Sequence, residues 1–89
     1  MRIKEGFVVE RVGNKYLAVA TDERADEFNA LISMNATGAF IFKRLSEGEA
    51  SFEELHELMM KEYDADSAVL RADLSAFLDK LRAASLLEE

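Results

Sequence analysis

The stretch FVVERVGNKYLAVA, residues 7–20, decides the fold, because it predicts a β-hairpin ahead of a part of the chain that is helical in pattern. Two runs rich in β-branched and aromatic residues, Phe7 to Val12 and Lys15 to Ala20, flank the dipeptide Gly13-Asn14. Such runs favour strands, and a Gly-Asn connection tolerates the positive φ of a two-residue hairpin turn. We therefore expect two antiparallel strands in the first third of the chain.

A third strand is predicted after a polar loop, residues 21–26. The run FNALISM, residues 28–34, alternates so that Phe28, Ala30, Ile32 and Met34 share one face. Three successive strands give a small antiparallel sheet whose third strand has a neighbour on one side only. Such an edge offers free backbone N–H and C=O groups to an incoming segment, unless it is covered or blunted.

Two helices are predicted next, each from its own end signals. Asn35 is placed to cap the first, and Gly48 is placed to end it. Ser51 and Glu54 form a capping box for the second. The apolar stripes at helical spacing are Phe40, Ile41 and Leu45 in the first helix, and Phe52, Leu55, Leu58, Met59 and Tyr63 in the second.

A third and longest helix follows, capped by Asp64 or Asp66 and ending near Leu86-Leu87. Its apolar residues recur at intervals of three and four: Leu70, Leu74, Phe77, Leu81 and Ala84. No proline, repeat or linker divides the chain. The order predicts a single α+β domain spanning residues 1–89, a three-stranded antiparallel sheet followed by three helices.

Length and composition limit the class of protein. A chain of 89 residues with 49% apolar residues can build one core. Cysteine is absent, which excludes disulfides, thiolate zinc sites and thiol nucleophiles and suits the cytoplasm. No segment has the length of a signal peptide's apolar region or of a membrane span, so we expect a cytoplasmic protein.

The charge is strongly negative and unevenly distributed. The net charge is −7, and residues 45–66 contain eight carboxylates against Lys61 alone, which gives −7 for that stretch. This field repels phosphate backbones and anionic lipid, so nucleic acid and membrane surfaces are poor partners. A solvated helix face is the simplest reading of the acidic stretch.

Residues that could carry chemistry are few. His56 is the only histidine, which excludes a His-paired nucleophile, and we expect an exposed, ordinary imidazole. No cofactor and no metal site are expected. Isolated Gly38 is expected to permit close packing against the sheet rather than to bind a phosphate. The methionines are expected to fill the core, with adaptable peptide contact as the alternative: Met34, Met59 and Met60.

Four stretches together resemble the PqqD-like family: MNATGAFIF at 34–42, SEGEA at 46–50, SFEEL at 51–55 and RADLSAFLDKLRAASLL at 71–87. The opening hairpin extends the resemblance over nearly the whole chain. The sequence departs from the family at Ser85, where a glycine often stands, and in RLSEG, which lacks a cysteine-aspartate-glycine. The positions that match are Asn35, Thr37, Gly38, Phe42, Asp73, Phe77, Leu81 and Leu86.

The resemblance implies a winged helix-turn-helix fold and a non-catalytic role as a recognition element for ribosomally made, modified peptides. Family members bind the leader of a precursor peptide as a strand added to the third strand, in the groove beside the third helix. They present it to a modifying enzyme, often a radical SAM protein. The pathway is that of pyrroloquinoline quinone or of another modified peptide.

On this reading a leader peptide adds along the third strand and its side chains settle against one flank of the third helix. The predicted peptide-binding residues are Phe28, Asn29, Ala30, Leu31, Ile32 and Ser33 on the strand, and Val69, Asp73, Ala76, Phe77 and Lys80 on the helix. A helical wheel places Val69, Asp73, Ala76 and Lys80 on one flank of the buried stripe. The alternative wall is the opposite flank, Arg71, Leu78 and Arg82.

Two other functions are compatible with this pattern. Winged helices often read DNA, but residues 67–84, the would-be recognition helix, carry a net charge of only +1. An accessory structural subunit of an enzyme complex would need no affinity for free peptide. Self-association as a homodimer also stays open.

Overall fold

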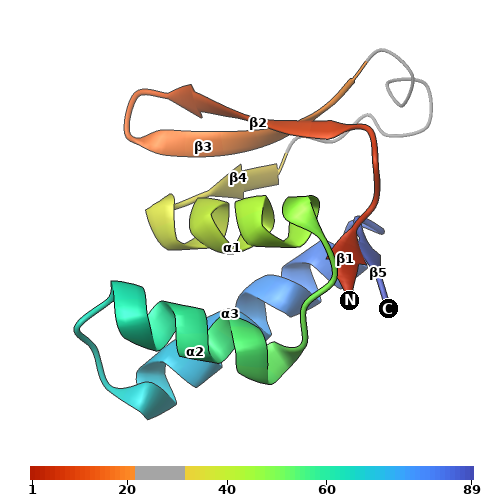
Figure 1. The fold of residues 1–89 in the computed structure, drawn as a ribbon. Coiled ribbons are helices and arrows are strands. Elements are labelled where there is room, and N and C mark those ends of the chain that lie inside the picture. Colours follow the sequence, from red (N-terminus) through yellow and green to blue (C-terminus); the bar gives the residue numbers. More distant parts are fainter. Residues whose placement is uncertain (22–31) are drawn as a thin grey trace.

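The computed structural model describes residues 1–21 and 32–89 (Figure 1). The predicted α+β architecture, with a three-stranded antiparallel sheet followed by three helices, is confirmed. The sheet has the order β2-β3-β4, and a second, two-stranded sheet pairs β1 with β5. The elements are β1 (Arg2–Ile3), β2 (Phe7–Val12), β3 (Lys15–Ala20), β4 (Ile32–Met34), α1 (Ala36–Glu47), α2 (Phe52–Glu62), α3 (Ser67–Ala83) and β5 (Leu87–Glu88).

The β1–β5 pair was not predicted, because a two-residue strand has no periodicity to reveal it. It holds the start and the end of the described chain side by side, with Ile3 opposite Leu87 (Figure 1). The third strand is seen only as Ile32–Met34, since residues 28–31 of the predicted strand lie outside the described residues. Within β4 the predicted alternation holds: Ile32 and Met34 are buried and Ser33 is exposed.

The helix starts follow the predicted caps. The Asn35 side chain accepts a hydrogen bond from the Gly38 N–H at 2.8 Å, and Ser51 with Glu54 forms the capping box of α2. Asp66, rather than Asp64, caps α3 by accepting from the Ala68 N–H. Each cap satisfies an N–H that lacks an acceptor within its own helix.

The predicted end of the third helix near Leu86-Leu87 was wrong, because α3 ends at Ala83. Ser85 has φ 62, and its N–H donates to the Arg82 carbonyl at 3.0 Å while the Leu86 N–H donates to the Leu81 carbonyl at 3.0 Å. These two bonds form a Schellman motif, which usually has glycine at the left-handed position. Because serine stands at this position instead of glycine, the sequence contains no recognisable signal for the end of the helix.

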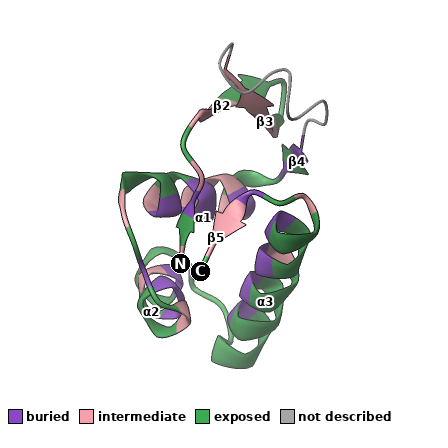
Figure 2. Ribbon diagram, turned by 90° about the vertical axis from the view of Figure 1, so that its right-hand side faces the viewer, coloured by how far each residue is buried: buried purple, intermediate pink, exposed green. Residues whose placement is uncertain are grey.

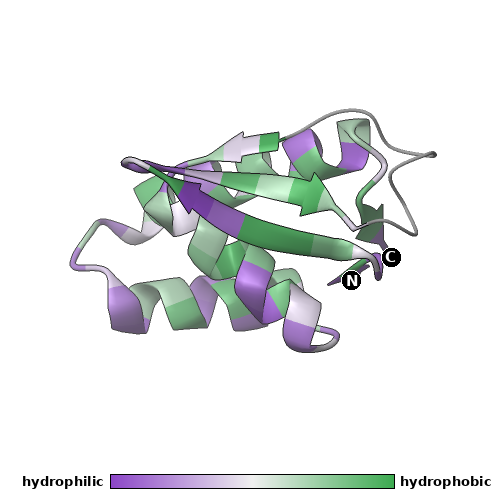
Figure 3. Cartoon of the chain, turned by 90° about the horizontal axis from the view of Figure 1, so that it is seen from above, coloured by the Kyte–Doolittle hydropathy of each residue, from purple (hydrophilic) through white to green (hydrophobic). Residues whose placement is uncertain are grey.

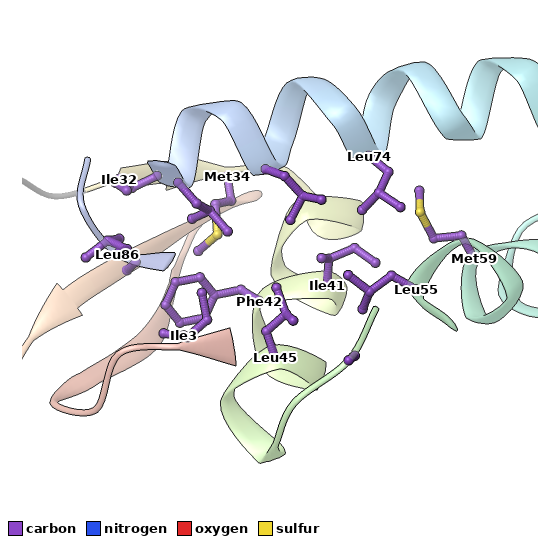
Figure 4. Close-up of a cluster of buried hydrophobic side chains, with 14 of the residues drawn as sticks. Ile3, Ile32, Met34, Ile41, Phe42, Leu45, Leu55, Met59, Leu74 and Leu86 are labelled. Atoms are coloured by element: carbon purple, nitrogen blue, oxygen red, sulfur yellow. The ribbon is translucent and has the colours of Figure 1, made fainter. Parts of the chain in front are cut away.

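The layers are visible in Figure 1, where α1 lies between the sheet and the pair formed by α2 and α3. Figure 2 shows burial concentrated on the faces that the three helices turn toward one another. Figure 4 shows the side chains of α1 meeting those of α3, α2 and β4 in one core. The largest fully buried side chains are Phe42, Ile41, Leu45, Leu55, Met59, Leu74, Leu78 and Leu81.

Three core assignments need correction. Leu78, assigned to a flank of the third helix, is only 1% exposed, whereas Phe77, assigned to the buried stripe, is half-buried against the edge of the core. Both residues are apolar and adjacent, so helical spacing alone could not rank them. Met60 is 43% exposed and does not fill the core, unlike Met34 and Met59. None of the helices among the described residues is long and apolar enough to cross a membrane.

Candidate functional site

A pocket of about 250 Å³ opens between β4, the first turns of α1 and the middle of α3. One side is the edge of the sheet and the other is a helix flank that presents small, apolar and charged side chains. The residues that line it are Ser33, Met34, Asn35, Thr37, Gly38, Ile41, Met59, Asp73, Leu74, Ala76, Phe77 and Lys80.

Gly38 lets α1 and α3 approach each other at the base of this pocket. A Cβ at this position would lie 3.0 Å from Phe77 Cε1 and 3.3 Å from Met34 Cβ. Contacts this short force the neighbouring groups to move, so the absent side chain is what allows Phe77 to cover the helix start. The expectation of close packing at Gly38 is confirmed, and the partner includes α3 as well as the sheet.

The hydrogen-bonding direction of the β4 backbone follows from the hairpin register. The Thr21 N–H donates to the Gly6 carbonyl at 2.8 Å, so odd-numbered residues of β3 pair with β2. Backbone groups alternate sides along an antiparallel strand, and even-numbered residues of β3 therefore pair with β4. Because Ser33 lies opposite Leu17, its N–H and C=O face the free edge of the sheet.

Lys80 reaches this free edge from α3. Its ammonium group donates a hydrogen bond to the Ser33 carbonyl. Asp73, on the same flank, lies seven residues earlier, or about 10 Å along the helix axis. The pocket therefore has a cation at its strand side and an anion farther along α3, with Ala76 and Phe77 between them.

The structure brings together five of the predicted peptide-binding residues around this pocket: Ser33, Asp73, Ala76, Phe77 and Lys80. Ile32 points into the core instead, at 6% exposure, and Val69 is 54% exposed and does not line the pocket. The other predicted strand residues, Phe28, Asn29, Ala30 and Leu31, lie outside the described residues. The opposite flank forms no matching wall, because Leu78 is buried.

Seven lining residues were missed as peptide-binding residues: Met34, Asn35, Thr37, Gly38, Ile41, Met59 and Leu74. Thr37, Gly38 and Ile41 come from α1 and Met59 from α2, and no sequence spacing reveals how close these helices lie to the third helix. The only available signal was the position of Gly38 one residue after Thr37, which marks a close approach of another element.

The expectation that His56 is exposed was wrong. Its ring is buried, with 7% exposure, and its Nε2 lies 3.1 Å from Ser67 Oγ and 3.3 Å from the Ser67 carbonyl oxygen. The acidic neighbours in sequence turn outward on α2, while His56 turns toward the start of α3. The imidazole joins the two helices and does not line the pocket.

The exposed flank of α3 opposite the pocket is tied to α2 by a two-bond ion pair. Arg71 Nη2 lies 2.7 Å from Glu53 Oε2, and Nη1 lies 2.9 Å from Oε1. Hydrogen bonding to Arg71 lowers the pKa of the Glu53 carboxyl from its ordinary value. Arg71, one of the residues of the alternative wall, is therefore held in an ion pair with α2 and does not line the pocket.

The fold and the open strand edge define the class of this protein: a small winged-helix-like α+β domain with a groove between an edge strand and its last helix. The family model of Coenzyme PQQ synthesis protein D (PqqD) matches residues 9–87. The chain belongs to the PqqD family, as its sequence motifs indicated.

Two solved structures share the fold over nearly their whole length. One is TbiB1 in complex with the TbiA(beta) leader peptide, with a TM-score of 0.73, 25% identity, and coverage of 99% of this chain and 95% of that chain. The other is lasso peptide synthetase B1 complexed with the leader peptide, with a TM-score of 0.70, 17% identity, and coverage of 99% and 96%. At that lower identity the likeness shows the fold alone. No curated protein sequence matches the chain.

Proposed function

We propose that this chain binds the leader segment of a ribosomally made precursor peptide and presents it to a modifying enzyme. The leader adds as a strand to the free edge of β4, and one of its apolar side chains enters the pocket beside α3. The observation that carries the proposal is the outward-facing N–H and C=O of Ser33 directly beside a partly apolar pocket. The similarity at 25% identity to a chain in complex with a leader peptide supports it.

In this role the chain has no catalytic turnover of its own and works in the cytoplasm with a partner enzyme. Membership of the PqqD family favours an enzyme of the radical SAM type. The lining of the pocket provides recognition: Ala76 and Phe77 offer apolar contact, while Asp73 and Lys80 can fix the register of the added strand.

A matched pair of variants at one residue tests the strand addition. Ser33→Pro removes the outward N–H without removing a bond to β3, whereas Ser33→Ala keeps the N–H and changes only the side chain. With a leader peptide from a neighbouring precursor gene, we expect Ser33→Pro to weaken binding by about 0.5–1.5 kcal/mol, up to about tenfold. Ser33→Ala should bind as the parent does.

Amide chemical-shift mapping with the same leader gives the location. Perturbations should cluster on β4 and on the flank of α3 that contains Asp73 and Lys80. A leader that perturbs only the acidic helix α2, or that binds Ser33→Pro and Ser33→Ala equally well, would show that the edge of β4 is not the site.

DNA binding is the second function to test, because the winged-helix arrangement is common to DNA readers. The net charge of −7 opposes it. We expect no shift of duplex DNA in a gel at physiological salt. A shift that weakened steeply with added salt would favour a regulator instead.

A further inference from the structure

The second edge of the same sheet is also open. Among the described residues, no strand pairs with the outer side of β2, which is six residues long. The bond from the Thr21 N–H to the Gly6 carbonyl places the even-numbered residues of β2 in the ladder with β3. The N–H and C=O groups of Val9 and Arg11 therefore face outward. This edge offers two such residues, whereas the described part of β4 offers one.

A groove of about 640 Å³ runs between this edge and α1. The sheet contributes Phe7, Val9 and Tyr16 to its lining, and α1 contributes Ala39, Phe40 and Lys43. Phe40 makes an edge-to-face contact with the ring of Tyr63, which also lines the groove, with 5.8 Å between ring centroids. An added strand with alternating apolar side chains requires apolar walls beside an unpaired strand edge, and these aromatic residues provide them.

The charge of the groove is opposite to that of the chain. Arg11 lies across from Tyr16 with its guanidinium 6.0 Å from the ring centroid, and Lys43 projects from α1. Within residues 1–21 and 32–89, no carboxylate lines the groove and Lys43 makes no hydrogen bond or ion pair. Two cations in an apolar groove, on a chain of net charge −7, favour an occupant with carboxylates.

β2 and β4 are the two outer strands of one sheet, as the view from above shows (Figure 3), and one groove lies beside each of them. The strands between them keep the two sites apart, so both can be occupied at once. A segment on β2 and a segment on β4 would extend the three-stranded sheet at both ends.

We propose that the β2–α1 groove is a second strand-addition site, which binds an extended segment of a partner protein with alternating apolar side chains and carboxylates. The proposal goes beyond leader binding and does not depend on it, because it concerns the other edge of the sheet. The chain would then hold two polypeptides through one sheet.

The probe is a short synthetic peptide, acetylated and amidated, in which leucine alternates with threonine and two glutamates precede the first leucine. Its control has lysines in place of the glutamates. We expect the glutamate peptide to perturb the amides of β2 and of the α1 face that contains Ala39 and Lys43, and to leave β4 and α3 unchanged. Amide hydrogen exchange should slow at Val9 and Arg11, whose N–H groups gain partners.

Charge reversal separates this site from a general effect of net charge. Lys43→Glu should weaken the glutamate peptide by about tenfold, while Lys61→Glu, an equal change on the exposed side of α2, should alter affinity less than about twofold. The lysine peptide should instead bind the Lys43→Glu variant more tightly than it binds the parent chain.

Three results would overturn the proposal. One is a glutamate peptide that perturbs only β4 and α3, which would make that edge the general peptide site. Another is the absence of any saturable shift at millimolar peptide. The last is self-association of the free chain with exchange protection at Val9 and Arg11, which would assign the groove to a second copy.

Discussion

Lys80 donates a hydrogen bond from its ammonium group to the carbonyl of Ser33, which ties α3 to the free edge of β4. The two residues are 47 positions apart in the chain. Ser33 is also the described residue of β4 whose N–H and C=O face outward. Lys80 therefore bonds to the same carbonyl that an added strand would use as an acceptor, and competes with it.

The first prediction concerns this contact. Lys80→Met keeps the length of the side chain and frees the Ser33 carbonyl, so we expect a leader without a carboxylate at that point to bind a few times more tightly, by about 0.5–1 kcal/mol. Lys80→Arg retains a donor and should bind as the parent does. Isothermal titration calorimetry measures both, and weaker binding by Lys80→Met would show that the ammonium contacts the peptide itself.

Gly38→Ala tests the close approach of α1 and α3. Alanine gains about 1 kcal/mol of helix propensity, but its Cβ crowds Phe77, and overpacking costs about 1–3 kcal/mol. We expect a net loss of about 1 kcal/mol in urea unfolding, together with weaker leader binding. The loss should vanish in the Phe77→Ala background, and an additive double-mutant cycle would contradict the contact.

Ser85→Gly tests the end of α3. A left-handed backbone costs a residue with a Cβ about 1 kcal/mol relative to glycine, and Ser85 has φ 62. We expect Ser85→Gly to stabilise the fold by about 1 kcal/mol. The control Ser75→Gly, on the exposed middle of the same helix, should destabilise it by about 0.5 kcal/mol. Thermal melts of the two variants should therefore move in opposite directions.

Leu78→Ala and Phe77→Ala compare how much two adjacent residues contribute to the free energy of unfolding. Leu78 is 1% exposed, so its truncation should cost about 2–5 kcal/mol, a large share of the stability of a domain this size. Phe77 is half-buried at the pocket, and we expect a smaller loss of about 1–3 kcal/mol with a larger effect on peptide binding. Denaturant midpoints give the order, and a greater loss from Phe77→Ala would place that ring inside the core.

The pair of Glu53 and Arg71 predicts a pH effect. Hydrogen bonding to Arg71 lowers the pKa of folded Glu53, so the pair stabilises the fold above the ordinary carboxyl pKa, and this contribution is lost as pH falls through the lowered value. Without this pair, Glu53→Gln should lose less of its free energy of unfolding than the parent does as pH falls below about 4.5. Glu57→Gln removes an exposed carboxylate without an ion pair among the described residues, so its free energy of unfolding should fall with pH as the parent's does. Unfolding measured from pH 3 to pH 7 compares the two.

Much of the local structure was predictable because it rests on bonds between residues close in sequence. The hairpin turn at Gly13-Asn14 and the caps at Asn35 and Ser51 each depend on residues at most three positions away. The PqqD resemblance, carried by short motifs in order, was confirmed for the same reason. A pattern in one segment is enough to identify features of this kind.

The tertiary structure alone decided which of two adjacent apolar residues, Phe77 and Leu78, enters the core and which borders the pocket. It also buried His56 against Ser67 and brought Lys80 to the edge of β4. The sequence determined the elements, their caps and the family, because those follow from local hydrogen bonds and periodicity. The sites formed only when distant segments packed, since close packing and the direction of an edge backbone are properties of the assembled sheet and helices.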